Sequence, residues 1–279
     1  MRRILPALVI AAALMAVVAP ARAQNDRDQD RDYDGPYHYD SSFKNTSTIA
    51  AGGTIRVEDL NGSIDVEASD NNSTTVTAVK KWRRGDPAMV HIVVEPSGNG
   101  LTVCALWDED ETHCGDHNVH SHHHGDNDRH NDVSVRFTVR VAKGVKVDLN
   151  TVNGSLDVSG ATAAVNAETV NGRVEIATLS GAVTARTVNG SVRATIEHRV
   201  RSAEPLELET VNGTVQLDAP ADLSADVDAE TTNGGIETDF PLTINKGLVG
   251  KHVHGTIGQG GRRVELHTTN GSVKLRKLG

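Results

Sequence analysis

Apolar and polar residues alternate around an Asn-Gly pair that recurs seven times, in segments such as TVNGSLDV at residues 151–158. With Asn as position zero, positions −6, −4 and +3 are apolar in every copy, and positions −5, −3 and +4 are polar in every copy. A period of two predicts β-strands with one buried and one solvated face, joined by a tight corner. The pairs are Asn61 and Gly62, Asn153 and Gly154, Asn171 and Gly172, Asn189 and Gly190, Asn212 and Gly213, Asn233 and Gly234, and Asn270 and Gly271.

Two architectures can use this unit. In a meander of hairpins, positions −3 and +4 of one copy would face each other, and four of the seven pairs would have like charge, which facing strands disfavour. In a solenoid, each position instead lies beside the same position of the next copy. Glu168 would then lie beside Arg186, and Arg186 beside Glu209, although Glu209 would face Glu230.

The other outward column and the repeat spacing also favour the solenoid. At position +4, Glu175 would lie beside Arg193 on one side and the like-charged Asp157 on the other. Three copies follow one another at intervals of 18 residues, and a constant rung length is what stacking requires. The later intervals are 23, 21 and 37 residues, and the longest can contain a degenerate corner at His254-Gly255, with Ile257 at +3.

We therefore expect an all-β fold. Residues 146–279 are predicted to form a β-solenoid of Asn-Gly repeats, in which each rung buries its apolar face by stacking on its neighbours. Asn-Gly supplies positive-φ residues for the corner at low strain. Six of the seven copies have Thr at position −2, whose hydroxyl we expect to bond to the corner backbone.

Residues 49–145 are predicted to form an N-terminal β section that caps the stack. Its cysteines, Cys104 and Cys114, most simply form a disulfide in an oxidising compartment, with a metal or redox pair as the alternative. Strands are expected over residues 54–57, 63–67, 74–79, 90–94 and 101–105.

The order of these motifs resembles the bacterial putative-adhesin family of β-strand-repeat domains of unknown function. The similarity rests on the TVNGS-type repeats, on GTIRVEDLNGSIDVEAS at residues 53–69, on GTIGQGGRRVELHTTNGSVKL at residues 255–275, and on the cysteine pair before residue 132. It extends over residues 49–279. The resemblance implies an exported, β-helical, envelope-associated domain and no established activity.

The start of the chain is typical of export. Residues 1–23 have two arginines, an apolar run and a small-residue cleavage site, as in a secretory signal peptide. Residues 24–48 are polar and Asp-rich, which predicts a disordered tail. We expect a periplasmic or extracellular protein, with no transmembrane segment after signal cleavage.

The composition of the chain limits the classes of partner that it can bind. The net charge of −9 argues against nucleic acid. Only 3% of the residues are aromatic, and Phe240 is the one aromatic residue after position 150, so the repeats lack the ring faces on which sugars stack.

The insert at residues 108–132 departs from the family pattern and is rich in His and Asp. Imidazole and carboxylate groups can bind Zn²⁺, Ni²⁺ or Cu²⁺, although no spacing here defines a fixed geometry. The alternative is a solvated loop. The candidate ligands are His113, His117, His120, His122, His123, His124 and His130.

The sequence favours an exported, non-catalytic, adhesin-like binding or structural protein whose partner is an envelope component or envelope protein. One alternative is a periplasmic metal-binding protein that uses the His-rich insert. A third is a polysaccharide-active β-helix enzyme, for which Asp157 and Glu175 are the candidate carboxylates. We expect no cofactor other than weakly bound divalent metal at the insert.

Overall fold

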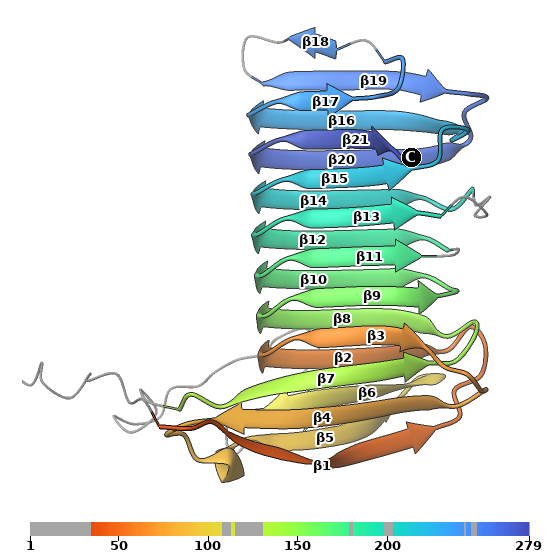
Figure 1. Ribbon diagram of the computed structural model, residues 1–279. Coiled ribbons are helices and arrows are strands. Elements are labelled where there is room, and N and C mark those ends of the chain that lie inside the picture. The colour runs from red at the N-terminus through yellow and green to blue at the C-terminus, as the bar shows by residue number, and fades with distance from the viewer. Residues whose placement is uncertain are drawn as a thin grey trace, which may run out of the picture. The chain divides into compact units, whose positions relative to one another are not determined.

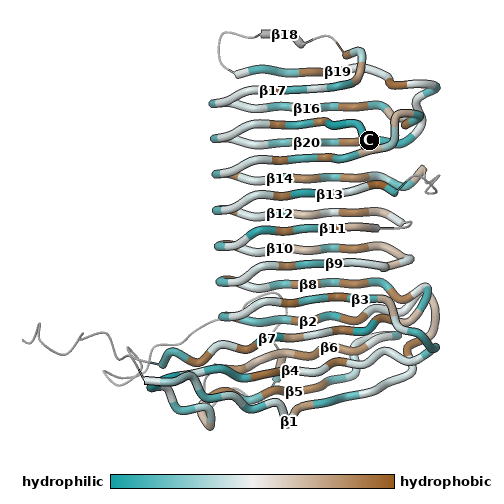
Figure 2. Tube along the Cα trace, in the orientation of Figure 1, coloured by the Kyte–Doolittle hydropathy of each residue, from teal (hydrophilic) through white to brown (hydrophobic). Residues whose placement is uncertain are grey.

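Strand–corner–strand units pass from one sheet into a second, and the two sheets share one core (Figure 1). The computed structural model describes residues 35–107, 113–114, 131–178, 181–197, 203–242, 244–246 and 250–278. Apolar and polar residues alternate along the strands in Figure 2, and inward side chains such as Ala167 and Ile176 are completely buried. The all-β prediction is therefore confirmed.

The first sheet, sheet A, contains ten strands in the described part of the chain. In spatial order they are β1 (His38–Ser47), β4 (Thr74–Trp82), β7 (Ser134–Val141), β3 (Ile64–Ala68), β9 (Leu156–Ala161), β11 (Val174–Thr178), β13 (Val192–Ile196), β15 (Val215–Ala219), β21 (Val273–Lys277) and β17 (Ile236–Thr238).

The second sheet, sheet B, contains eleven described strands. In spatial order they are β18 (Ile244–Lys246), β19 (Lys251–Ile257), β16 (Ala225–Asn233), β20 (Arg262–Asn270), β14 (Leu206–Asn212), β12 (Val183–Asn189), β10 (Val165–Asn171), β8 (Lys146–Asn153), β2 (Thr54–Asn61), β6 (Gly100–Leu106) and β5 (His91–Ser97). A single 3₁₀ turn, η2 (Pro87–Met89), is the helical element of the described chain.

The Asn-Gly copies pair in parallel with equal positions side by side, as a solenoid requires. Asn171 of β10 is paired with Asn153 of β8 on one side and Asn189 of β12 on the other. The second strands of the same copies pair in the same way in sheet A. This arrangement excludes the hairpin meander for these copies, because the two strands of one unit belong to different sheets.

The copies do not stack in sequence order throughout. In sheet B, β20 lies between β14 and β16, and in sheet A, β21 lies between β15 and β17. The copy that comes last along the chain is thus inserted between the two copies that precede it. The expectation that Glu209 faces Glu230 was wrong, because His267 lies between them.

Electrostatics provides a physical reason for the insertion. In sequence order, Asp218 and Asp239 would be neighbours at position +6. In the structure, Arg276 is paired with Asp218 in the strand register and forms ion pairs with Glu237 and, at 3.3 Å, with Asp239. The inserted copy therefore separates acidic residues that would otherwise repel one another.

The predicted degenerate corner at His254-Gly255 was also wrong. Both residues belong to β19, which runs antiparallel to β16. Ile257 is buried opposite Ala225, so it packs in the core as a strand residue and not at position +3 of a corner.

At the N-terminal end, β2 and β3 form a unit stacked on β8 and β9. Beyond this unit, sheet A continues into the antiparallel strands β7, β4 and β1, and sheet B continues into β6 and β5. The predicted disordered tail is contradicted over His38–Ser47, which pairs with β4 as an edge strand. An edge strand can be polar on both faces, which explains why its sequence resembles a tail.

Candidate binding surface

The corners that join the strands of sheet B to those of sheet A lie along the left edge of the stack in Figure 1, and their asparagines form a ladder. Five side-chain amides donate to the side-chain oxygen of the neighbouring Asn, each at 2.9 Å. The ladder follows the spatial order of the rungs, namely Asn153, Asn171, Asn189, Asn212, Asn270 and Asn233. Asn61 instead donates to the backbone oxygen of Val133.

The corner glycines are required by close backbone approach. A Cβ atom at Gly172 would lie 1.9 Å from the carbonyl oxygen of Gly154, and one at Gly190 would lie 2.0 Å from that of Gly172. The predicted reason, a positive φ, is correct only in part, because Gly190 has φ 159° and lies almost in extended backbone. Stacked corners leave no space for a side chain, whatever the backbone dihedral.

The threonines at position −2 bond to corner backbone, as predicted, and the partner belongs to the neighbouring rung. The hydroxyl of Thr169 donates to the Gly154 oxygen at 3.0 Å, and that of Thr187 to the Gly172 oxygen at 3.0 Å. The same bond is made by Thr151, Thr210, Thr231 and Thr268. The corners are therefore fastened to one another through side chains as well as backbone.

Position −1 carries a column of exposed valines beside the Asn ladder. Val170, Val188 and Val211 are exposed by 38%, 39% and 38%, and the parallel register of β10, β12 and β14 places them on adjacent rungs. Among the side chains that the structure describes, the other exposed large hydrophobic ones are Tyr37 and Tyr39. We call the three valines together with the asparagines that follow them the corner strip.

The corner strip combines two kinds of contact on a straight, rigid edge. Adjacent strands lie about 4.8 Å apart, so the valines offer an aliphatic line of regular spacing. The exposed asparagines of the ladder beside them have amide groups with further donor and acceptor capacity. Such an edge can bind an extended or repetitive surface through apolar contact and hydrogen bonds.

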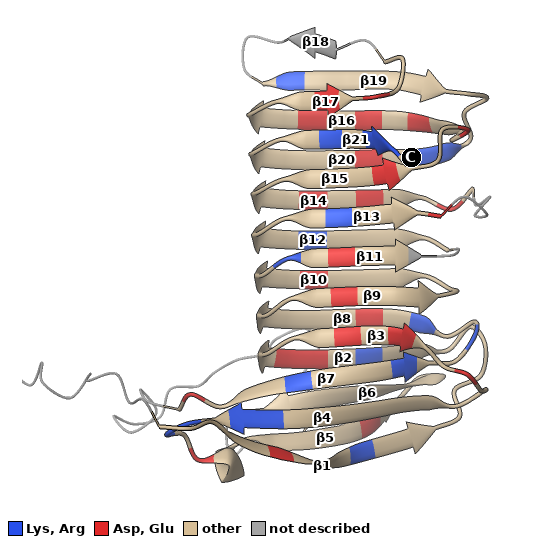
Figure 3. Ribbon diagram, viewed as in Figure 1, with Lys and Arg blue, Asp and Glu red and all other residues tan. Residues whose placement is uncertain are grey.

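Figure 3 shows basic and acidic positions on neighbouring strands of the stack, and several of these residues form ion pairs. Arg186 on β12 contacts Glu168 of the rung on one side at 3.3 Å, and Glu207 and Glu209 of the rung on the other side at 2.5 and 3.2 Å. The hydrogen bond to Glu207 is the largest influence that raises the pKa of Arg186. The predicted attractions of Arg186 within its column are therefore present.

The candidate catalytic carboxylates Asp157 and Glu175 lie side by side on β9 and β11, as expected. Arg173, at position +2 of the same corner as Glu175, lies 3.2 Å from Asp157 and 3.8 Å from Glu175. This arginine offsets their repulsion. The other expected partner, Arg193, forms its ion pair with Asp218 at 2.7 Å.

The first copy has Asp59 where the other six have Thr. This carboxyl is fully buried, and burial raises its pKa to about 7, although the backbone N–H groups of Asn61 and Leu60 donate to Oδ1 and favour the charged form. The position is therefore sensitive to protonation near neutral pH.

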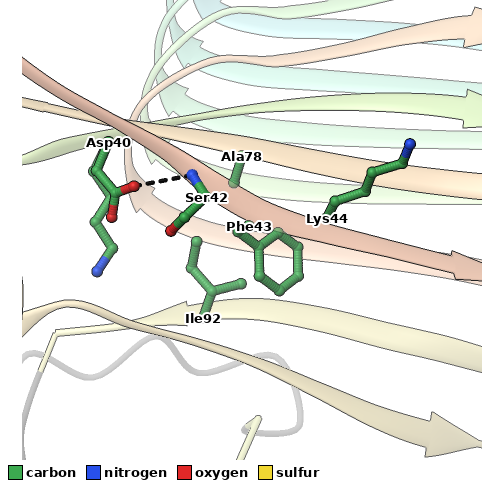
Figure 4. A pocket seen from close by; sticks show the side chains of 7 residues that line it. Asp40, Ser42, Phe43, Lys44, Ala78 and Ile92 are labelled. Atoms are coloured by element: carbon green, nitrogen blue, oxygen red, sulfur yellow. Dashed lines mark hydrogen bonds between the residues drawn. The ribbon is translucent and has the colours of Figure 1, made fainter.

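A hollow of about 350 Å³ lies at the N-terminal end, between β1, β4 and β5 (Figure 4). Phe43, Ala78 and Ile92 provide its apolar lining. Its polar groups are engaged locally: Asp40 accepts from the Ser42 nitrogen, which lowers the Asp40 pKa, and Lys80 donates to the Pro87 oxygen. The first contact lies within β1, and the second connects β4 to the 3₁₀ turn η2.

The cysteines and the insert are described only in part. Cys104 and Cys114 form a disulfide. His113 contacts Glu95 through Nδ1 at 2.7 Å. The other six candidate ligands in the insert, from His117 to His130, and the predicted signal peptide lie outside the described residues. None of the described helices is long and apolar enough to cross a membrane.

Comparison with known proteins gives the family. The profile described as Toastrack DUF4097 matches residues 53–276. The chain belongs to the Toastrack DUF4097 family. The match spans the first Asn-Gly copy, the cysteine pair and all later copies, so the corner strip lies within the Toastrack domain, and the resemblance seen in the repeats is confirmed.

Two solved structures are similar to this Toastrack protein. A putative cell adhesion protein from Clostridium sporogenes ATCC 15579 has 8% identity and a TM-score of 0.45, with 85% of this chain and 99% of that chain covered. A putative adhesin from Bacteroides fragilis NCTC 9343 has 11% identity and a TM-score of 0.31, with 85% and 96% covered. No match was found among curated proteins.

Proposed function

We propose that this Toastrack protein is an exported, non-catalytic, adhesin-like binding or structural protein that presents its corner strip to a component of the cell envelope. One observation carries the proposal: Val170, Val188 and Val211 form an exposed aliphatic column on adjacent rungs. Contiguous exposed apolar groups on a soluble protein usually mark an interaction surface.

The chain itself shows that the corner does not require valine. Thr232 and Thr269 occupy the same position on β16 and β20, and their corners keep the same Asn ladder and Thr hydroxyl bonds. An exposed valine gives no advantage over threonine in solvation. The valines on the middle rungs are therefore better explained by a partner that covers them.

Export is supported by the disulfide and by the start of the sequence. Disulfides persist in oxidising compartments, and Cys104 and Cys114 are bonded. We propose a periplasmic or extracellular location on this basis, together with the signal-like residues 1–23.

The enzyme alternative is less well supported. Paired catalytic carboxylates must be able to exchange protons or attack a sugar, and their environments usually differ. Asp157 and Glu175 both lie on the outward face and share Arg173 as an ion-pair partner. This arrangement fits a surface charge ladder.

The experiment is co-sedimentation of the mature protein with washed envelopes of its source bacterium, with and without EDTA. A triple variant, Val170→Thr, Val188→Thr and Val211→Thr, copies the residue used at positions 232 and 269, so it should fold normally. We expect saturable, EDTA-insensitive binding that the triple variant weakens about tenfold or more, because three methyl groups leave the contact.

The matched control extends the column with Thr232→Val and Thr269→Val, and should bind at least as tightly as the unchanged protein. Unchanged binding by the triple variant would exclude the corner strip as the contact surface. Binding lost in EDTA would show that the envelope contact requires a metal ion and not the corner strip alone, and no binding to envelopes would contradict the proposed function.

A further inference from the structure

Two histidines and a carboxylate converge on the outward face of sheet B, away from the corner strip. His252 and His254 lie two residues apart on β19, so both side chains point to the same face of the strand. Asp228 lies on the neighbouring strand β16, directly opposite His254 in the antiparallel register. Glu230 is opposite His252.

The donor atoms are close together. Nδ1 of His252 lies 3.8 Å from one Asp228 oxygen, and Nδ1 of His254 lies 3.6 Å from the other. Ligand atoms of all three residues lie within 4.8 Å of one another, and the two imidazole rings are stacked with their planes 16° apart. Three donors from two strands thus surround one point above the sheet.

We propose that Asp228, His252 and His254 bind a divalent first-row transition metal ion such as Zn²⁺. Neutral imidazole nitrogen and carboxylate oxygen are the ligands that such ions take in proteins. Tetrahedral ligands with bonds of about 2.0–2.1 Å lie about 3.3 Å apart, close to the distances observed here. The side chains are 37%, 45% and 71% exposed for Asp228, His252 and His254, so small rotations can complete the geometry.

The surrounding charges favour a cation at this place. Glu207 and Glu209 on the outward face have Arg186 as an ion-pair partner, and Glu265 has Arg263. Asp228 and Glu230, in contrast, have histidines as their charged contacts: Asp228 contacts His252 and His254, and Glu230 contacts His267 at 4.0 Å. His252 and His254 are neutral when they bind a metal, so the ion would supply the positive charge beside Asp228.

The metal would connect β19 to β16 near the end of sheet B. The last described strand beyond β19 is the three-residue β18. A coordinated ion would therefore hold the terminal antiparallel strand against the parallel stack. This role is separate from the proposed binding by the corner strip, and either can fail without the other.

Zinc titration by calorimetry tests the site. The starting protein is the full mature chain in which the seven histidines of the insert are changed to Ser, so that the insert cannot bind zinc. We expect one equivalent of Zn²⁺ to bind, and each of His252→Gln, His254→Gln and Asp228→Asn to weaken binding about tenfold or more.

Two matched controls are His267→Gln, on the neighbouring strand, and His91→Gln, at the other end of sheet B, and both should bind zinc like the starting protein. Circular dichroism should show that all five variants fold, since the side chains are on the surface. Absence of zinc binding, or equal binding by the site variants and the controls, would overturn the proposal.

Nitrogen NMR of the imidazoles provides a second readout. Because Nδ1 of both histidines faces Asp228, zinc should shift the Nδ1 resonances of His252 and His254 and leave the proton on Nε2. Coordination through Nε2, or shifts confined to other histidines, would contradict the geometry.

Discussion

At the scale of single residues, position −2 distinguishes the first copy from the others. Six copies place a threonine hydroxyl there that donates to a neighbouring corner carbonyl. Asp59 instead places a carboxyl in the core, and one of its oxygens, Oδ2, has no hydrogen-bond partner. An ionised carboxylate is costly in such a place, so protonation of Asp59 should affect stability.

The unfolded Asp59 carboxyl should release its proton near its ordinary pKa of 3.8, whereas the folded one holds it to about pH 7. The folded state therefore binds more protons between these values, and its stability should fall as the pH rises from about 4 to about 7. Asp59→Thr should abolish this loss and raise the free energy of unfolding at pH 8 by on the order of 4 kcal/mol. Urea denaturation at pH 4 and pH 8 measures the difference.

The reverse change, Thr169→Asp, places the same carboxyl on a middle rung and should introduce the same loss of stability between pH 4 and pH 8. If Asp59→Thr leaves the pH dependence of unfolding as steep as before, Asp59 does not hold its proton in the folded state.

The sequence predicts part of this detail. Position −2 is an inward position in the alternation along the strand, so Thr187 is predicted to point inward near the corner. Its hydroxyl does bond to corner backbone. The sequence does not reveal that the partner is the corner of another rung. The same alternation places Val188 outward, so its exposure could have been inferred from the pattern that identified the core.

At the scale of elements, the parallel register places equal repeat positions side by side. Charged residues at one outward position therefore interact with those at the same position of the neighbouring strands. Arg186 on β12 contacts three glutamates on the two neighbouring strands, β10 and β14. Alternation in the sequence predicts β2, β3, β4, β5 and β6 as well as the repeats. It does not predict β1 or β19, because their pairing depends on which strand edge remains free.

Arg186→Gln should leave Glu168, Glu207 and Glu209 close together without a cation. We expect a loss of about 1 kcal/mol in the free energy of unfolding at low salt, since the pairs are partly exposed. The loss should shrink in 1 M NaCl, where the Debye length is about 3 Å. Thermal or urea unfolding at two salt concentrations measures both quantities.

Arg263→Gln is the matched control, because Arg263 contacts Glu265 of its own strand and is mostly exposed. It should change stability by less than about 0.5 kcal/mol. A loss for Arg186→Gln that is equally small, or that does not respond to salt, would show that the three-strand network contributes nothing.

At the scale of the whole molecule, rung order was the feature that the repeats did not reveal. All copies have nearly the same pattern, so any of them can stack on any other by apolar matching alone. The charges at the outward positions indicate the rung order, because His267 and Arg276 separate acidic residues that stacking in sequence order would bring together. The sequence likewise shows His252 and His254 two residues apart. Only the strand pairing shows that Asp228 lies opposite His254.

Cysteine cross-linking tests the rung order. Cα atoms of laterally paired strand residues are close enough for a disulfide, which requires about 4.4–6.8 Å. The pair Glu209→Cys with His267→Cys should therefore cross-link under mild oxidation, because the two residues are in register on β14 and β20.

The pair Glu209→Cys with Glu230→Cys is the matched control and should remain reduced, since β20 separates the two strands. Mass spectrometry of peptides from unreduced protein identifies the linked residues. A 209–230 link without a 209–267 link would show that the copies stack in sequence order.

The inserted copy also has a consequence for how the chain reaches its final state. During synthesis, residues 206–240 leave the ribosome before residues 262–277, so β14 and β16 lack β20, the strand that pairs with both of them, until that later segment has been made. Their free edges cannot close on each other without bringing Glu209 against Glu230 and Asp218 against Asp239. The distal part of the stack can therefore be completed only after residues 262–277, which lie between the two preceding copies, have been made.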